Sequence, residues 1–404
     1  MRKKFFVAFL LLVCALVTGQ LAAQDEGEIV TYVLGVAQPF TGPLGSFGTD
    51  FSKGIELAVE QMNAELESAG LNIRFEIASQ DTEGTPEGAA RAVQTIVQTT
   101  GAQVIVGPLT TSEVLGAKQF ADENGIVIVA PASSGAAGGI PGDNIFRVMY
   151  PPDNFAAKAF AEIATRRGYE NVAILHMDDP FGNGLAEQFE ADFTAAGGGE
   201  VVAISYTPDP VDLASEATAL SAEVSRLSAE GSTAVFCICF LADAQKLLQV
   251  AAVDPVLSTT EWMGIENLAN PELLQDAAHA DFLRNVNFIS VSFTDSSTPL
   301  AQSFVESFTE KFGSEPGPFT NYAFDAANIA MLSMLIAGND GEAVKEILPF
   351  VSNHYIGTAV QAYLDENGDQ AIAYYGIYKV SPDAPEFTLV GTYDGSSGEL
   401  ELTE

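Results

Sequence analysis

The 404-residue chain is poor in the residue types that build metal sites and nucleic-acid surfaces. It holds only 3 histidines and 3 cysteines, and 17 lysines and arginines stand against 54 aspartates and glutamates. No two histidines lie close together in the sequence, so a zinc site has no starting pair of ligands. Nucleic acid requires a clustered basic face, which a formal net charge of -37 does not supply. We therefore expect neither a metal nor a nucleic-acid partner.

Sequence signatures of enzymes and cofactor sites are also missing. Gly182-Asn-Gly184 lacks the third glycine of a dinucleotide-binding loop, and neither a phosphate loop nor a Gly-x-Ser-x-Gly elbow occurs. Carboxylates are too numerous for one catalytic pair to stand out. We expect no cofactor and no catalysis, and an enzyme ranks below a binding protein.

The excess of acid does not indicate disorder, because hydrophobic residues make up 47% of the chain. At about 150 residues per domain, the length predicts two or three domains. The first 24 residues are predicted to be a secretory signal: three basic residues precede an apolar run from Phe5 to Val17 that is too short to span a bilayer comfortably. Lipid attachment at Cys14 is the alternative. We expect an exported protein, in the periplasm or on the outer face of the cell membrane.

Only Cys237 and Cys239 remain after the signal. They alternate within the apolar run Val235 to Phe240, so on a strand their side chains share a face. That spacing does not give the geometry of an easy mutual disulfide, and we favour two buried thiols over a redox pair.

Short apolar runs alternate with amphipathic stretches along the whole chain. Continuous hydrophobicity within each run is typical of parallel strands covered on both faces, and the stretch from Phe51 to Leu66 has helical spacing. We predict an α/β fold with two doubly wound parallel-sheet lobes. A break is expected at Pro151 and Pro152, because two prolines cannot continue a ladder. The runs read as strands are 29–37, 73–78, 104–106, 126–130, 145–149, 172–175, 201–204, 235–240, 285–293, 374–380 and 387–393.

Loops rich in Gly, Ser and Thr follow three strands of the first half, at 38–50, 107–112 and 130–135. In open parallel sheets, ligands bind outside the carboxyl ends of the strands. Each loop leads into a helix start, where unpaired N–H groups and hydroxyls can hold an anion. Helix capping alone explains any single loop, but three loops at one edge favour a binding site for a carboxylate or another anion.

A set of short motifs occurs in a fixed order, and the ordered set is more specific than any member. They are Thr41-Gly-Pro43, Lys53-Gly-Ile-Glu-Leu-Ala58, Asp81-Thr82, Val106-Gly-Pro108, Ala130-Pro-Ala-Ser-Ser134, Asp179-Pro-Phe-Gly182, Trp262-Met-Gly264, Tyr322-Ala-Phe-Asp-Ala326 and Asp365-Glu-Asn-Gly-Asp369. In this order they resemble the type I periplasmic binding proteins of the branched-chain amino acid class, over essentially the whole mature chain.

The resemblance implies two lobes joined by three crossing segments, with a ligand cleft between them. Lobe 1 would comprise residues 25–149 and about 290–355, and lobe 2 residues 150–289 and about 356–404. The implied function is that of a monomeric, extracytoplasmic receptor of an ABC importer, which captures an apolar or branched-chain amino acid by hinge closure and is recognised by a membrane permease.

The resemblance also implies the residues of the site. Thr111 and Ser134, with their neighbours Thr110 and Ser133, would supply hydroxyls to the ligand carboxylate, and Glu266 would hold the ligand ammonium. A buried carboxylate is costly unless a cation pairs with it, which agrees with that role for Glu266.

Phe47 and Phe181 would wall the cleft, and Tyr322 is placed with them. Ordinary packing is the alternative for these aromatic residues. The family often has tyrosine where Phe181 stands, which leaves the side-chain specificity open. Asp325 either supports the cleft or packs within lobe 1. Two alternative functions stay open. The same scaffold could bind an amide, urea or an aromatic acid, or the receptor could act on a signalling partner in place of the transporter.

Removal of the signal leaves 14 basic against 54 acidic residues, a net charge of -40. Self-repulsion at this charge opposes compactness, and salt screens it. The melting temperature is therefore expected to rise between low and molar salt, and a melting temperature that stays level or falls would contradict this expectation.

Overall fold

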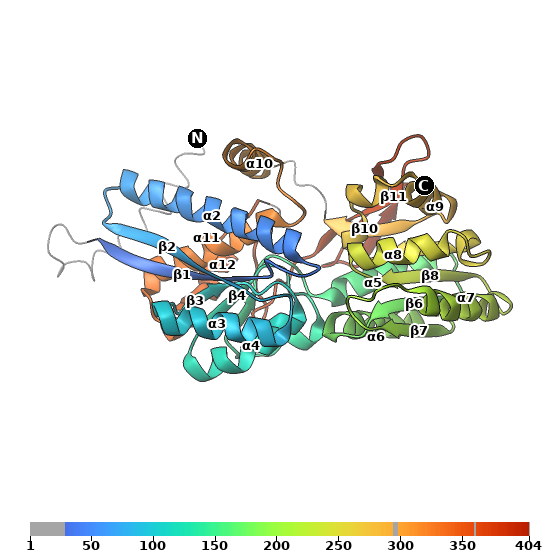
Figure 1. The fold of residues 1–404 in the computed structure, drawn as a ribbon, viewed down its shortest axis with the longest axis horizontal. Coiled ribbons are helices and arrows are strands. Elements are labelled where there is room, and N and C mark those ends of the chain that lie inside the picture. The colour runs from blue at the N-terminus through green and yellow to red at the C-terminus, as the bar shows by residue number, and fades with distance from the viewer. Residues whose placement is uncertain (1–28, 294–297, 359–360, 404) are drawn as a thin grey trace. The chain divides into compact units, whose positions relative to one another are not determined.

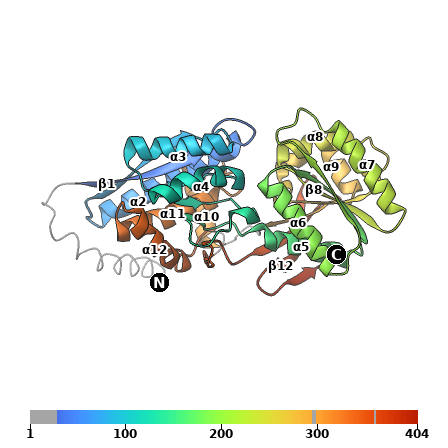
Figure 2. The same ribbon diagram turned by 90° about the horizontal axis from the view of Figure 1, so that it is seen from below.

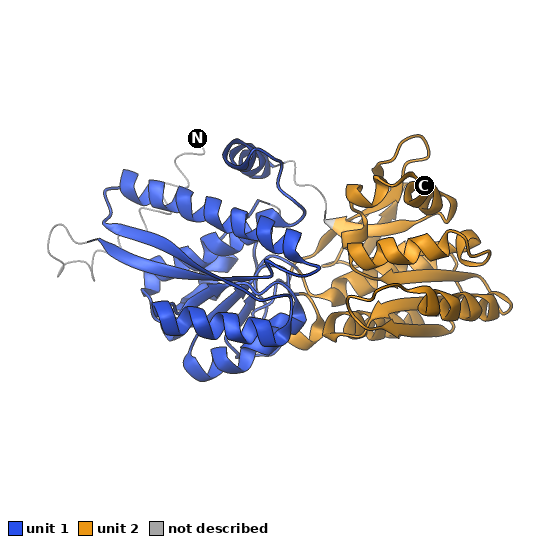
Figure 3. Ribbon diagram, viewed as in Figure 1, with its two compact units in different colours: residues 1–133, 140–150, 296–371 blue, residues 134–139, 151–295, 372–404 orange. Residues whose placement is uncertain are grey.

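The computed structural model describes residues 29–293, 298–358 and 361–403, so the predicted signal and Cys14 lie outside the described residues. The chain forms two compact units, shown in different colours in Figure 3. Unit 1 takes Met1–Ser133, Ile140–Tyr150 and Ser296–Ala371, and unit 2 takes Ser134–Gly139, Pro151–Asp295 and Ile372–Glu404.

Unit 1 is built on a five-stranded sheet whose order is β2-β1-β3-β4-β5. All of its neighbouring strands run parallel, as the continuous apolar runs predict. The three central strands are fully buried or nearly so along most of their length. The strands are β1 (Val30–Gln38), β2 (Ile73–Asp81), β3 (Val104–Val106), β4 (Val127–Ala130) and β5 (Ile145–Arg147).

Helices cover both faces of this sheet (Figure 1). One face carries α2 (Gly45–Ser68), α11 (Thr320–Ala337) and α12 (Gly341–Asn353), and the other carries α3 (Pro86–Thr100) and α4 (Thr111–Asn124). Helix α10 (Pro299–Phe312) packs on α2 through an aromatic cluster. Helix α12 is absent from the predicted helices; its interior holds Pro349, a residue that normally ends a helix.

Unit 2 is built on an eight-stranded sheet whose order is β13-β12-β11-β10-β9-β8-β6-β7. Its strands from β6 to β10 pair in parallel, whereas β11, β12 and β13 add an antiparallel edge. Short turns join those last strands, and short turns can connect only antiparallel neighbours. The strands are β6 (Asn171–Met177), β7 (Val201–Tyr206), β8 (Thr233–Ile238), β9 (Glu261–Gly264), β10 (Ile289–Phe293), β11 (Tyr374–Val380), β12 (Phe387–Asp394) and β13 (Glu399–Leu402).

One face of the second sheet carries α5 (Asp153–Arg166) and α6 (Pro180–Ala195), and the other carries α7 (Ala214–Ser228), α8 (Leu241–Ala251) and α9 (Ala277–Asn285), as Figure 2 shows. The prediction of a two-lobed α/β fold is confirmed. Within the described ranges, no helix combines the length and the apolar character needed to cross a bilayer.

The compact units differ from the predicted lobe boundaries in three places. Strand β10 belongs to unit 2, because it pairs with β9 and β11 in the second sheet. Ser134–Gly139 also belongs to unit 2. The stretch before Ala371 belongs to unit 1, where the guanidinium of Arg147 meets the carboxylate of Asp369 in two hydrogen bonds of 2.5 Å.

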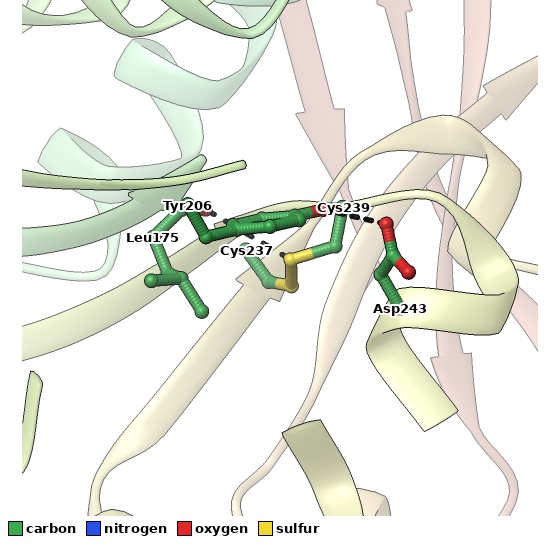
Figure 4. The surroundings of a disulfide bond; sticks show 5 residues. All are labelled: Leu175, Tyr206, Cys237, Cys239 and Asp243. Atoms are coloured by element: carbon green, nitrogen blue, oxygen red, sulfur yellow. Dashed lines mark hydrogen bonds between the residues drawn. A yellow bond between two sulfur atoms is a disulfide. The ribbon is translucent and has the colours of Figure 1, made fainter. Parts of the chain in front are cut away.

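The prediction of two free thiols is wrong, because Cys237 and Cys239 form a disulfide (Figure 4). Their Cα atoms are 5.5 Å apart, a separation that a disulfide can bridge. Strand β8 ends at Ile238, so Cys239 lies beyond the ladder and its backbone is not held in the strand geometry on which the prediction rested. A disulfide is typical of an oxidising compartment, which agrees with export.

Asp325 is fully buried on α11 and organises the segment that follows α12. One carboxylate oxygen accepts from the Tyr355 hydroxyl at 2.8 Å, and the other accepts from the Thr358 N–H and the Thr358 hydroxyl at 2.7 Å each. Burial raises the pKa of Asp325 to about 6, although these three hydrogen bonds oppose the shift. The structure therefore gives Asp325 a packing role within unit 1.

The disulfide has a direct test. A peptide that contains Cys237 and Cys239 should resist alkylation in denaturant and take up two labels only after reduction. Because the bridge closes so short a loop, replacing both residues by alanine should cost less than the ~2–4 kcal/mol typical of disulfides. Two labels without reductant would show that the thiols are free.

Asp325 should also contribute to the pH dependence of the free energy of unfolding. A carboxyl whose pKa is higher in the folded than in the unfolded chain binds protons preferentially in the folded state, so its contribution to stability falls as the pH rises from about 4 to about 6. Asp325→Asn should remove this fall. Between pH 4 and pH 7, the free energy of unfolding of the variant, measured with urea, should therefore rise by roughly 2 kcal/mol relative to that of the wild type. Glu346→Gln, an exposed neutralisation on α12, should follow the wild-type profile.

Candidate functional site

The carboxyl ends of the strands in unit 1 meet at one edge of the sheet, as predicted from the loop sequences. Strands β1, β2, β3 and β4 run parallel, and each is followed by a loop that leads toward a helix. Gly107 permits the close approach of β3 to β1 at this edge, since a Cβ there would lie 2.1 Å from the carbonyl oxygen of Ala37. Its φ of +103° also favours glycine.

Thr111 and Ser133 are brought together at this edge. Their hydroxyl oxygens are 3.1 Å apart, and both residues are almost completely buried. Thr111 begins helix α4 after β3, and Ser133 follows β4, so two different loops supply the pair. Hydroxyls beside the first turn of a helix can hold an anion.

Ser134 is the next residue but belongs to unit 2. Its carbonyl accepts a hydrogen bond from the N–H of Asp153 at 3.0 Å, where α5 begins. The two predicted serines are therefore adjacent in sequence and divided between the units.

Thr110 has a different role from its neighbour Thr111. It is the N-cap of α4: its hydroxyl accepts from the N–H of Glu113 at 3.3 Å and donates to the Glu113 carboxylate at 2.7 Å. The N–H of Thr110 donates to the same carboxylate oxygen at 2.9 Å, which completes a capping box. The Thr110 hydroxyl is thus already committed to the helix start.

Glu113 is buried completely and also accepts from the hydroxyl of Thr82, which is buried as well. Burial raises the pKa of Glu113 above its ordinary value, although the hydrogen bonds from Thr82 and Thr110 oppose that shift and the nearby Asp81 adds to it. This residue joins the loop after β2 to the start of α4, and it was missed among the sequence-predicted residues. The spacing Thr-x-x-Glu is the signal that could have revealed it.

The first loop of this edge is held by Asp81, at the end of β2. Its carboxylate accepts from the N–H of Phe40 at 2.9 Å, the hydroxyl of Thr41 at 2.6 Å and the N–H of Glu83 at 2.8 Å. Burial works to raise the pKa of Asp81, but these hydrogen bonds outweigh it and lower the pKa.

The predicted aromatic residues of unit 1 do not share one environment. Phe47 is half-buried in the first turn of α2, next to Gly48, where a Cβ would lie 1.9 Å from the carbonyl oxygen of Pro39. Tyr322 is buried in α11 and packs edge-on against Tyr150, with ring centroids 6.0 Å apart. Ordinary packing accounts for most of the surface of Tyr322.

In unit 2, Phe181 stacks on Phe240, with ring centroids 5.6 Å apart and planes 9° from parallel. Phe181 lies in the first turn of α6, which Asp179 caps by accepting from the N–H of Gly182 at 2.7 Å. Phe240 is the N-cap of α8 and directly follows the disulfide-bonded Cys239. Phe240 is not among the sequence-predicted site residues, so its pairing with Phe181 was not predicted.

Glu266 is 5% exposed and follows β9. The preceding residue fixes its position: the N–H of Ile265 donates to the carbonyl of Cys237 at 3.2 Å, and the carbonyl of Ile265 accepts from the Ser290 hydroxyl at 3.0 Å. A carboxylate therefore lies near the carboxyl ends of β8 and β9, the edge where α/β sheets bind ligands.

The predicted residues thus fall into two groups. Unit 1 holds Phe47, Thr110, Thr111, Ser133 and Tyr322, and unit 2 holds Ser134, Phe181 and Glu266. Among the described residues, no cluster of three or more His, Cys, Asp or Glu could hold a metal ion.

Known proteins resemble this chain along most of its length. The family model described as periplasmic binding protein matches residues 31–384. A Leu/Ile/Val-binding protein homolog 3 from Brucella melitensis is 31% identical over 207 residues, which cover 50% of this chain and 53% of that protein.

Solved structures agree on the fold. A leucine-binding protein, LivK, from Thermotoga maritima has a TM-score of 0.76 at 22% identity, covering 91% of this chain and 99% of that one. A solute-binding protein of an ABC transporter from R. palustris, solved in complex with benzoate, has a TM-score of 0.75 at 17% identity, covering 93% and 98%. With its two α/β units and the family match across them, this chain belongs to the periplasmic binding proteins.

Proposed function

We propose that this protein captures a small carboxylate-bearing solute, in the first place an apolar or branched-chain amino acid, for an ABC importer. The observation that carries the proposal is the Thr111–Ser133 hydroxyl pair at the carboxyl edge of a parallel sheet. Hydroxyls at a helix start accommodate a carboxylate without a basic residue, which suits a chain with few lysines and arginines.

The ammonium of an amino acid would be held by Glu266. A carboxylate that is 5% exposed is expensive to keep charged unless a cation or several donors accompany it. The stacked rings of Phe181 and Phe240 would contact an apolar side chain.

The proposed mechanism is closure on the ligand. Thr111 and Ser133 belong to one unit and Glu266 and Phe181 to the other, so a ligand that engages both groups favours a closed state. A membrane permease would recognise that state, and the receptor would act as an exported monomer.

An aromatic acid is the second candidate ligand. The stacked pair of Phe181 and Phe240 favours it, since flat aromatic rings bind well against a planar apolar wall, and the R. palustris neighbour was solved with benzoate. This ligand would use the hydroxyl pair but would have no ammonium for Glu266.

A thermal-shift screen followed by calorimetry separates these candidates. The panel is leucine, isoleucine, valine, leucinamide, benzoate and urea, because binding raises the melting temperature by mass action. If leucine binds through both charged groups, Glu266→Gln should weaken it by roughly 2 kcal/mol or more, while Glu272→Gln, an exposed residue nearby, should leave it unchanged.

Benzoate binding that is indifferent to Glu266→Gln would favour the aromatic acid. Leucine binding that survives Glu266→Gln would remove the ammonium role of Glu266. Failure of every compound to bind would overturn the proposed ligand class.

A further inference from the structure

We propose that Glu113 is a positioning residue for carboxylate recognition: it locks Thr110 into the cap of α4 and thereby presents Thr111 and Ser133 as the hydroxyls that meet the ligand. This inference rests on the proposed function and concerns a residue outside the predicted site.

The geometry around Glu113 supports a positioning role. One carboxylate oxygen receives both the N–H and the hydroxyl of Thr110, at 2.9 and 2.7 Å, and the other receives the hydroxyl of Thr82. Thr82 is itself fixed, since its N–H donates to the carbonyl of Gln38 at 3.0 Å. Glu113 therefore connects the ends of β1, β2 and β3 through a single buried side chain.

Once this hydrogen-bond network forms, the backbone at the start of α4 has little conformational freedom. Thr111 follows Thr110 directly, so fixing the peptide and side chain of Thr110 also fixes the direction in which α4 starts. Close packing adds to the restraint, because a Cβ at Gly116 of α4 would lie 2.3 Å from the carbonyl oxygen of Pro86. The separation of 3.1 Å between the hydroxyls of Thr111 and Ser133 depends on that start.

The charge of Glu113 adds a consequence that a neutral cap would not have. Glu113 lies two residues from Thr111, so its ionised form repels a carboxylate bound there, and its protonation relieves the repulsion. The charged neighbour on β2 is Asp81, whose negative charge raises the pKa of Glu113. Glu87 and Arg91 of α3, the helix packed against α4, are exposed, and β4 holds no titratable residue.

The test compares the binding of leucine to three variants of the full mature chain by calorimetry from pH 5 to pH 8. Glu113→Ala removes the network and should weaken leucine about tenfold or more at pH 7. Asp340→Ala is the matched control: it removes the N-cap of α12, where Asp340 accepts from the N–H of Ala343 at 3.1 Å, at the opposite edge of the sheet. It should lower the melting temperature without changing the dissociation constant.

Glu113→Gln distinguishes a positioning role from a purely structural one, because its effect on leucine binding should depend on pH. Glutamine can keep the hydrogen bonds to Thr110 through its oxygen while removing the charge. It should bind leucine several-fold more tightly than the wild type at pH 8, and the ratio of the two dissociation constants should shrink as the pH falls, because protonation of Glu113 removes the charge that distinguishes the two proteins. Titration that the two proteins share, such as that of Asp325, affects both alike and cancels from the ratio.

The outcomes separate this inference from the proposed function. If leucine binds the wild type, but Glu113→Ala behaves like Asp340→Ala and the Glu113→Gln ratio is constant with pH, Glu113 has no positioning role and the proposed function stands. If leucine does not bind the wild type at all, the proposed amino acid ligand fails and this inference falls with it.

Discussion

The buried ion pair between Arg147 and Asp369 is the contact on which the organisation of unit 1 depends. The two residues are 1% and 2% exposed and 222 positions apart in the sequence, and two hydrogen bonds of 2.5 Å join their side chains. Backbone bonds add to it, from the N–H of Arg147 to Gly368 and from the N–H of Gln370 to the carbonyl of Arg147, each at 2.9 Å. Removal of one partner from such a pair typically costs about 3–5 kcal/mol, because the other charge stays buried. The chain leaves unit 1 after Tyr150 and again after Ala371. Two of the segments that lead into unit 2 therefore begin within a few residues of the Arg147–Asp369 ion pair.

The acidic residues of the protein divide into two chemical classes. Most are solvated, and their mutual repulsion is a property of the whole surface. A few are buried and hold loops by accepting hydrogen bonds, as Glu113 holds the start of α4 and Asp325 holds the segment around Thr358. Burial raises the pKa of both groups, so each costs stability in its ionised form and is retained for the loop geometry that it fixes. The net charge therefore says little about the site, where single carboxylates decide the geometry.

Most strands of the two sheets, the helix that includes Phe51 to Leu66 and the loop-rich edge could be predicted from the sequence, because the hydrophobic period and the residues that end strands and helices act locally. The sequence could not give the antiparallel pairing of β11 with β10, because these two strands are far apart in the sequence and only the fold makes them neighbours. The Cys237–Cys239 bridge was missed because the prediction assumed regular strand geometry through both residues, whereas β8 ends at Ile238 and Cys239 lies beyond the ladder. At the site, only Thr110 of the two neighbouring threonines has a glutamate three residues later, and that spacing could have marked it as the capping residue and left Thr111 for the hydroxyl pair with Ser133.

Chain order in unit 1 has a consequence for how the molecule is made. The five strands of its sheet are complete by Arg147, yet α11 and α12, which cover one face together with α2, begin only at Thr320 and Gly341. This apolar face of the sheet can therefore be fully covered only after some 170 further residues have been added to the chain. Contacts of such high sequence separation form slowly. During synthesis the first half of the chain therefore cannot complete the packing of unit 1 alone, and that packing is finished only after α11 and α12 have been made.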